Sequence, residues 1–202
     1  MGGTHGPCYH PNKSFFSNLN HNWGVVPVYD SLQAPCSGQS DPMSSSTSTA
    51  YDQGVTIADH VIDTETSDGF TGAKLAYIDL EPFSNSSSCT AAPKAFVNGY
   101  VHELHAKGHK AGLYINATQP GGIPFAGIDN PPDAVWIADY NGKNSAAPDA
   151  VDTSGTRTTE WTHDQRLHQY DQNRTAQPSG VNTSVQYDPD AVDAPILTNN
   201  VP

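Results

Sequence analysis

Two carboxylates separated by a single residue, Asp79 and Glu81, are the strongest chemical signal in the sequence. They stand at the end of the apolar run 75–80, which has the pattern of a buried strand; Pro82 ends it because proline has no N–H for the ladder. Side chains two apart on a strand point to the same face. Glycoside hydrolysis needs such a pair, with one carboxyl protonated and the other charged. The motif is short, and the alternative interpretation is a strand-end pair that simply reaches water.

Strand-like and helix-like segments alternate along the chain, which predicts βα units and a parallel sheet. The predicted helices span 14–21, 51–66 and 91–107, the last two from apolar residues at helical spacing. The predicted strands span 24–32, 75–81, 110–116, 134–140, 166–171 and 185–192. Polar and aromatic residues gather where these strands end. In parallel α/β folds, active groups collect beyond the carboxyl ends of the strands.

The composition narrows the range of partners and compartments. A formal net charge of −12 argues against nucleic acid and anionic membranes as partners, because an acidic surface does not attract either. No apolar stretch approaches the length of a membrane span. The low charged fraction of 15% and the abundant Ser, Thr, Asn, Gly and Pro are typical of secreted proteins. No signal peptide is visible, so we expect secretion to need a leader that this chain lacks.

The sequence has three cysteines, Cys8, Cys36 and Cys89, and none forms a C-x-x-C pair. Their wide spacing favours an oxidising compartment, with one disulfide and either a leftover thiol or a partner outside the chain. We interpret Cys8 and Cys36 as a structural disulfide rather than as nucleophiles, because no catalytic Cys–His pair can be inferred. Cys89 is then unpaired.

Neither a metal nor a cofactor is expected. His102, His105 and His109 lie close together, but His-Glu-Leu-His does not match the H-E-x-x-H zinc motif. We interpret them as a solvated histidine face. Asp190 and Asp193 are acidic loop residues or calcium ligands, although their spacing matches no EF-hand.

A set of stretches spread over residues 1–193 shares the pattern of one family. They are Val26-Pro27-Val28-Tyr29, Leu32-Gln33-Ala34-Pro35-Cys36, Tyr77-Ile78-Asp79-Leu80-Glu81, Glu103-Leu104-His105-Ala106-Lys107-Gly108, Gly112-Leu113-Tyr114, Val135-Trp136-Ile137-Ala138, His168-Gln169-Tyr170 and Tyr187-Asp188-Pro189-Asp190. On these residues the chain resembles the Rv2525c-like glycoside-hydrolase-like domain of secreted bacterial proteins, itself similar to the family 25 lysozymes.

The resemblance implies an α/β fold, a TIM-barrel-like (β/α)8 domain over residues 1–193, followed by a tail over 194–202. The family pattern begins with a strand that carries an aspartate and a cysteine, whereas this chain begins at Gly2-Gly3. We therefore expect a barrel that is incomplete at its N-terminus, with the first strand and most of the second missing.

The resemblance also implies a mechanism on peptidoglycan or a related cell-wall polysaccharide. Glu81 is then the general acid, Asp79 stabilises the developing positive charge or positions the sugar N-acetyl group, and Asp188 holds substrate or water. The implied substrate-binding residues are Tyr29, Gln33, Asn116, Trp136, Tyr140, Gln169 and Tyr170. Trp136 is alternatively a core residue.

Three functions stay open at this point. The carboxylate pair together with Asp188 favours a glycoside hydrolase. The missing first-strand aspartate favours a catalytically inactive glycan- or cell-wall-binding module on the same fold. The third is a structural or interaction domain without sugar contact.

Overall fold

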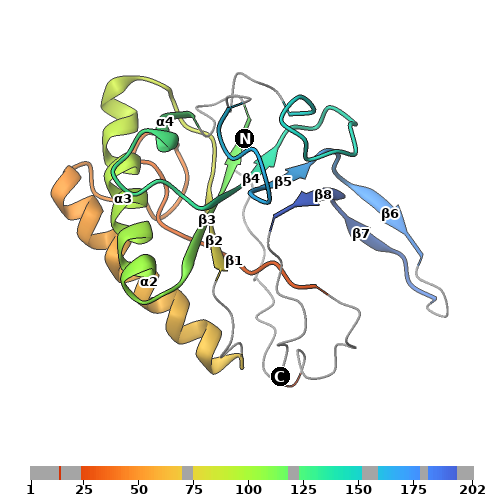
Figure 1. Cartoon of the computed structure of the whole chain (residues 1–202), viewed down its shortest axis with the longest axis horizontal. Coiled ribbons are helices and arrows are strands. Elements are labelled where there is room, and N and C mark those ends of the chain that lie inside the picture. Colours follow the sequence, from red (N-terminus) through yellow and green to blue (C-terminus); the bar gives the residue numbers. More distant parts are fainter. Residues whose placement is uncertain are drawn as a thin grey trace.

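The structure is a computed structural model that describes Ser14 and residues 24–69, 75–117, 123–151, 159–177 and 182–194. Its centre is a six-stranded sheet with the order β1-β2-β3-β4-β5-β8 (Figure 1). The strands are β1 (Val28–Tyr29), β2 (Leu75–Leu80), β3 (Lys110–Asn116), β4 (Ala134–Ala138), β5 (Arg166–Gln169) and β8 (Asp190–Asp193). Strands β1 to β5 are parallel, and β8 pairs antiparallel with β5.

The two long helices, α2 (Thr47–Ser67) and α3 (Ser87–Ala106), lie side by side against one face of this sheet, and the short α4 (Ile123–Ala126) follows β3 (Figure 1). Both long helices were predicted, and each begins four residues earlier than expected, after a serine in an extended conformation. Neither serine forms a side-chain cap hydrogen bond, and the first turn of each helix is mostly polar, so the apolar pattern alone placed the boundary too late.

Two glycines allow α2 and α3 to approach to backbone contact. A Cβ atom on Gly54 would lie 2.0 Å from the carbonyl oxygen of Phe96, and one on Gly99 would lie 2.2 Å from that of Tyr51. No side chain fits at such distances, so these positions require glycine.

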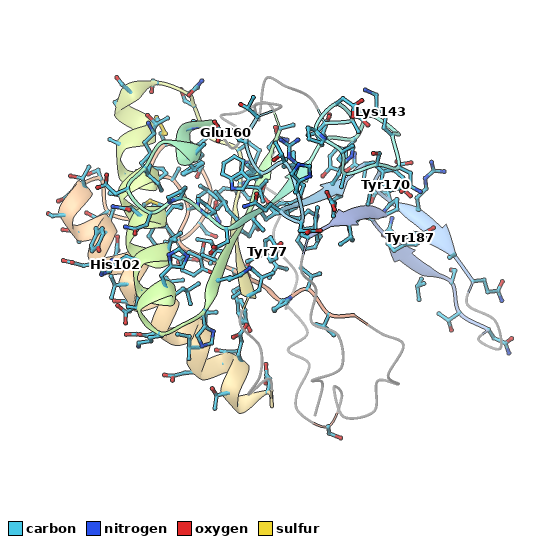
Figure 2. The ribbon with its side chains drawn as sticks, in the orientation of Figure 1. Tyr77, His102, Lys143, Glu160, Tyr170 and Tyr187 are labelled. Atoms are coloured by element: carbon cyan, nitrogen blue, oxygen red, sulfur yellow. A yellow bond between two sulfur atoms is a disulfide. The ribbon has the colours of Figure 1, made fainter. Side chains whose placement is uncertain are left out.

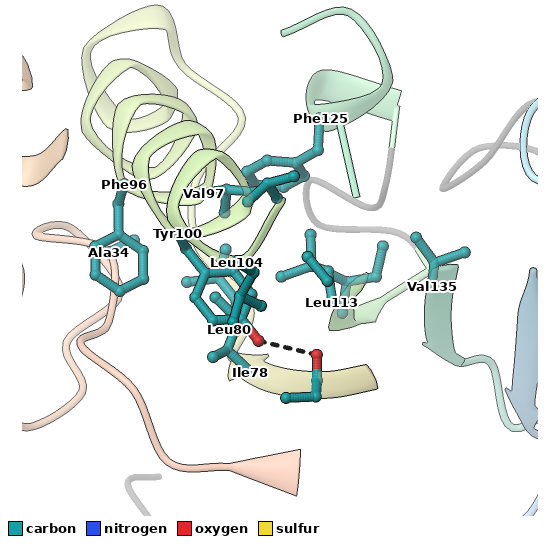
Figure 3. Close-up of a cluster of buried hydrophobic side chains, with 14 of the residues drawn as sticks. Ala34, Ile78, Leu80, Phe96, Val97, Tyr100, Leu104, Leu113, Phe125 and Val135 are labelled. Atoms are coloured by element: carbon teal, nitrogen blue, oxygen red, sulfur yellow. Dashed lines mark hydrogen bonds between the residues drawn. The ribbon is translucent and has the colours of Figure 1, made fainter. Parts of the chain in front are cut away.

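The main core lies between the helices and the sheet. The alternation of side chains turns Ala76, Ile78 and Leu80 of β2 toward the helices. There they meet buried side chains of α3, and the Tyr100 hydroxyl donates a hydrogen bond of 2.9 Å to the Ala76 carbonyl (Figure 3). The opposite face of β2 carries Tyr77 in a smaller apolar cluster.

A two-stranded hairpin, β6 (Arg174–Ala176) with β7 (Val185–Tyr187), projects from the main sheet (Figure 1). The predicted single strand 185–192 is therefore wrong. Asp188 and Pro189 divide it, so β7 pairs with β6 while β8 joins the main sheet. The carbonyl of Pro189 accepts the Tyr170 N–H at 3.2 Å, but proline has no donor with which to continue the ladder.

The observed architecture is a mixed α/β fold with a mostly parallel sheet. Within the described part of the chain, β1 and β8 are the two edges of the six-stranded sheet, and the antiparallel β8 departs from the all-parallel order of a (β/α)8 barrel. The predicted strand 24–32 is reduced to β1. The predicted helix 14–21 and the tail lie almost entirely outside the described residues. No helix among the described residues is long and apolar enough to cross a membrane.

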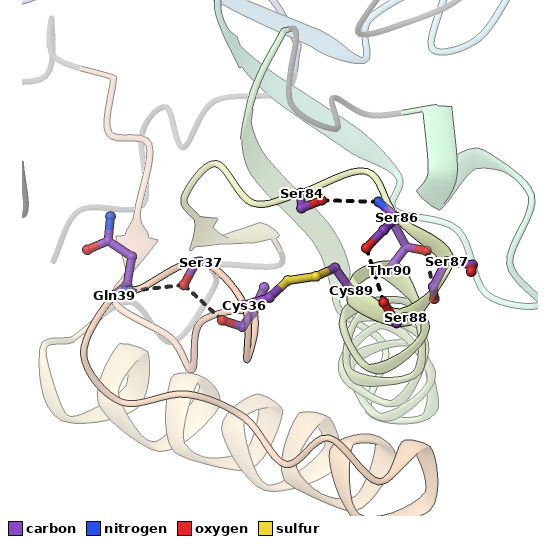
Figure 4. The surroundings of a disulfide bond; sticks show 10 residues. Cys36, Ser37, Gln39, Ser84, Ser86, Ser87, Ser88, Cys89 and Thr90 are labelled. Atoms are coloured by element: carbon purple, nitrogen blue, oxygen red, sulfur yellow. Dashed lines mark hydrogen bonds between the residues drawn. A yellow bond between two sulfur atoms is a disulfide. The ribbon is translucent and has the colours of Figure 1, made fainter.

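A disulfide joins Cys36, in the loop after β1, to Cys89, in the first turn of α3 (Figure 4). The predicted Cys8–Cys36 bridge is therefore wrong, and Cys8 lies outside the described residues. The cysteine spacing gave no information on pairing, because the fold brings together residues that are 53 positions apart.

Candidate active site

The candidate site lies on the sheet face opposite the helices, near the carboxyl ends of the parallel strands. The strand register aligns Asp79 with Tyr114 and Tyr114 with Trp136, so these three side chains share one face. One step toward the carboxyl ends, the register aligns Asn116 with Ala138, Ala138 with Gln169, and Gln169 with Asp190. Two rows of polar and aromatic side chains therefore cross this face.

The strand end that carries Asp79 and Glu81 is held by a side-chain amide. Gln33 Nε2 donates to the Asp79 carbonyl at 3.0 Å, and Gln33 Oε1 accepts the Glu81 N–H at 2.9 Å. The Ser31 hydroxyl adds a bond of 2.8 Å to the same carbonyl. Because β1 stops pairing with β2 at Ile78, the Gln33 amide continues the ladder past the end of the strand. Gln33 was predicted to bind substrate, but its amide is engaged in fixing the backbone between the two acids.

Gln169 is the centre of a second hydrogen-bond group. Its Oε1 accepts the hydroxyl of Tyr114 at 2.8 Å and the hydroxyl of Tyr140 at 3.1 Å. Its Nε2 donates to Asp188 Oδ2 at 3.4 Å, and Asp188 Oδ1 accepts the Asn173 N–H at 2.6 Å. Residues from β3, the loop after β4, β5 and the segment before β8 thus meet at one amide.

The tyrosine hydroxyls connect the two groups electrostatically. Burial is the main reason why the pKa of Tyr114 lies well above its usual value, and the neighbouring Tyr140 and the charges of Asp79 and Glu81 add to the rise. Burial also raises the pKa of Tyr140, with contributions from Asp188 and Glu81. Both phenols therefore stay protonated and act as hydrogen-bond donors among carboxylates.

Asp190 is a further acid of this face. Trp136 Nε1–H donates to Asp190 Oδ1 at 2.6 Å, and the indole packs edge-on against Tyr114, with 5.4 Å between ring centroids. Burial raises the pKa of Asp190 to about 6, although the bond from Trp136 opposes the rise. The sequence indicated only an acidic loop residue or calcium ligand here. The two-residue spacing of Asp188 and Asp190, the same as that of the first acid pair, was the signal that could have identified it.

Two of the predicted binding residues lie elsewhere. Tyr29 aligns with Ile78 and so shares the helix-facing side of the sheet, where burial, Glu65 and Asp68 raise its pKa. Tyr170 follows Gln169 and points to the opposite face, with its ring centroid 6.2 Å from that of His168. Tyr29 and Tyr170 therefore lie outside the candidate site. The other predicted residues that the structure places on the site face are Asp79, Glu81, Asn116, Trp136, Tyr140, Gln169 and Asp188.

The three histidines of α3 and the loop after it do not form one solvated face. His102 is exposed (Figure 2), and His105 contacts Asp133 at 2.7 Å. His109 is mostly buried, with Nδ1 at 3.7 Å from Glu65 Oε2. In the part of the chain that the structure describes, no group of three or more His, Cys, Asp or Glu side chains is arranged to hold a metal ion.

Comparisons with known proteins identify one family. The family model described as "Rv2525c-like, glycoside hydrolase-like domain" matches residues 13–192. No curated protein matches the chain. A crystal structure of an uncharacterized protein from B. stearothermophilus aligns with a TM-score of 0.49 and 14% identity, over 81% of this chain and 71% of that one.

Proposed function

Because the chain belongs to the Rv2525c-like, glycoside hydrolase-like family, we propose that it cleaves a glycosidic bond in peptidoglycan or a related cell-wall polysaccharide. The observation that carries this proposal is the convergence of Asp79, Glu81 and Asp188 around the Tyr114–Gln169–Tyr140 hydrogen bonds. Paired carboxylates beside neutral hydrogen-bond donors are the groups that glycoside hydrolysis uses.

In the proposed reaction Glu81 is the general acid that protonates the leaving glycosidic oxygen. Asp79, fixed on the same strand end by Gln33, stabilises the positive charge that develops on the sugar ring. Asp188 holds the attacking water or a sugar hydroxyl, since one of its oxygens already accepts from the Asn173 amide and thereby fixes the carboxylate.

The two tyrosine hydroxyls and the Asn116 amide suit the site to hydroxyl-rich ligands. Tyr114 and Tyr140 both donate to Gln169, so their hydroxyl oxygens keep lone pairs that can accept from a sugar. Asn116, in the outer row of the same face, supplies an amide. The half-exposed Tyr140 offers an aromatic face for a sugar ring, whereas the indole of Trp136 is occupied by Asp190 and the neighbouring rings.

We further propose that residues 1–193 form one barrel-like domain and that the protein works outside the cell. The Cys36–Cys89 disulfide supports an oxidising compartment.

The test is turnover of purified peptidoglycan, followed by the release of reducing ends, for wild type and for Glu81→Gln. Loss of the general acid should lower the rate at least about a hundredfold. The control is Glu103→Gln, which removes a carboxylate that pairs with Lys107 on the outer surface of α3. Equal rates for wild type and Glu81→Gln would remove Glu81 from the acid role. If the wild type binds peptidoglycan without cleaving it, the inactive binding module becomes the better description.

A further inference from the structure

The side of β5 that faces away from the candidate site carries two polar residues, which contact carbonyl groups of the described segments 139–151 and 159–165. Arg166 and His168 are 1% and 0% exposed. Arg166 Nε donates to the carbonyl of Trp161 at 2.8 Å. The His168 ring lies between two further carbonyls of these segments, with Nδ1 at 2.6 Å from the Ser145 oxygen and Nε2 at 2.8 Å from the Asp139 oxygen.

This geometry determines the protonation state of His168. A backbone carbonyl oxygen accepts hydrogen bonds and cannot donate them, so each ring nitrogen must carry a hydrogen to bond its partner. A neutral imidazole has one N–H and would place a lone pair against the second carbonyl. Only the imidazolium, with both nitrogens protonated, satisfies both contacts.

The two carbonyls bracket residues 139–145, which we call the bracketed segment, and this segment carries a residue of the candidate site. Within it the Asp139 N–H donates to the Gln169 carbonyl at 3.1 Å, and the Gly142 N–H donates to the Tyr170 carbonyl at 2.9 Å. Between these anchors the Tyr140 hydroxyl reaches Gln169 Oε1 at 3.1 Å. His168 therefore holds both ends of the segment that presents Tyr140.

The charges around the ring are compatible with a buried cation. Asp190 of β8 interacts electrostatically with His168, and this interaction lowers the pKa of the Asp190 carboxyl against the dominant effect of burial. Asp139 belongs to the bracketed segment itself, and its Oδ2 accepts from Asn141 at 2.6 Å. On β5, Arg166 lies on the same face two residues earlier and has Asp193 of β8 as its electrostatic partner, and the neutral ring of Tyr170 packs beside His168.

We propose that His168 is a positioning residue, cationic in the folded protein, which clamps the bracketed segment and thereby sets Tyr140 against Gln169. The proposal rests on the proposed function only for what Tyr140 binds, which is a sugar of the glycan. Loss of a proton from His168 removes one of the two donors, so the clamp opens as the pH rises.

The protonation state is tested directly on the wild-type protein. Long-range proton–nitrogen NMR spectra of the histidine rings should show both nitrogens of His168 in the N–H state at mildly acidic pH, together with retained hydrogen bonds to the two carbonyls. A His168 ring with one bare nitrogen under these conditions would overturn the proposal. This measurement needs no substrate and no variant.

The clamp is tested by amide hydrogen exchange, expressed as protection factors to remove the intrinsic effect of pH. In wild type, the protection of the Gly142 amide should fall about tenfold across the titration of His168, the factor expected for losing one hydrogen bond to a charged group. His168→Gln, which offers its amide N–H to one carbonyl only, should show the lower protection at every pH. His163→Gln, an exposed histidine before β5, is the control and should behave as wild type.

Binding of soluble peptidoglycan fragments adds a functional readout. The wild type should bind more weakly as His168 deprotonates, and His168→Gln should lose this pH dependence. Equal segment protection in wild type and His168→Gln at all pH values would overturn the positioning role. If the wild type binds no glycan at any pH, the proposed function fails, and the NMR and exchange results alone decide on the clamp.

Discussion

Glu65 gives a prediction in which the sign and size of a pH effect follow from the structure. This residue, near the C-terminal end of α2, is 1% exposed, and His109 Nδ1 lies 3.7 Å from its Oε2. Tyr29 of β1 and Tyr100 of α3 also lie within its electrostatic range. Burial raises the pKa of Glu65 from 4.5 to about 7.

A carboxyl group that binds its proton more tightly in the folded protein than in the unfolded chain makes the protein less stable as the pH rises. Below pH 4.5 both states are protonated and stability does not change with this group. Between pH 4.5 and about 7 the unfolded chain ionises first, and the folded state loses stability relative to it. The full loss is about 3 kcal/mol.

The perturbation is Glu65→Gln, which keeps the shape of the side chain but cannot ionise. We expect the free energy of unfolding of the wild type to fall by about 3 kcal/mol between about pH 4 and about pH 8, and that of the variant to fall much less. The assay is urea denaturation followed by tryptophan fluorescence at a series of pH values. Asp63→Asn, an exposed acid two residues earlier on the same helix, is the matched control.

The result that would refute this reasoning is a parallel pH dependence of the wild type and Glu65→Gln. Carbon-13 NMR titration of the Glu65 carboxyl would then locate the error. A pKa near 4.5 would mean that His109 or water compensates for burial.

Two further predictions concern the helix crossing and the strand end. Gly99→Ala should lower the free energy of unfolding by more than about 3 kcal/mol in thermal or urea unfolding, because its Cβ would overlap the Tyr51 carbonyl. Gly127→Ala, in open space, is the control and should have little effect. A mild effect of Gly99→Ala would show that the helices can separate. Gln33→Ala should cost about 1–3 kcal/mol of stability and lower the rate of glycan turnover, because the Glu81 N–H loses its partner and the Asp79 carbonyl keeps only the Ser31 hydroxyl. Gln39→Ala on the same loop is the control, and unchanged stability would mean that the strand end does not need the amide.

Much of the sheet could be predicted because its strands are buried and rich in apolar residues. β3 has the predicted bounds, and the strand with Asp79 lies where the apolar run placed it. The shared face of Asp79 with Tyr114 and Trp136 follows from alternation once the register is known. The register between neighbouring strands cannot be predicted from the residues of one strand, because it depends on how the strands pack against each other.

Tyr29 shows the consequence of that missing information. On a strand of two residues, a shift of one position moves a side chain to the other face of the sheet, and the sequence pattern around β1 is too short to exclude the shift. Gln33 illustrates a different difficulty. Nothing in its residue type distinguishes an amide that binds a ligand from one that replaces a backbone partner.

The acid group was predicted only in part. Asp190 was missed because it belongs to an antiparallel strand, whereas the prediction assumed parallel units throughout. The clamp at His168 could not have been found from the sequence, since it depends on how two carbonyl groups of the polar loop after β4 lie against the ring.

The junction between β7 and β8 connects the projecting hairpin to the candidate site. The hairpin leaves the main body after Asn173 and returns at Asp188, and the Asn173 amide donates to the Asp188 carboxylate across this base. One residue at the base of the hairpin, Asp188, is thus also one of the acids of the candidate site. The orientation of the Asp188 carboxylate therefore depends on where the base of the hairpin holds the Asn173 amide.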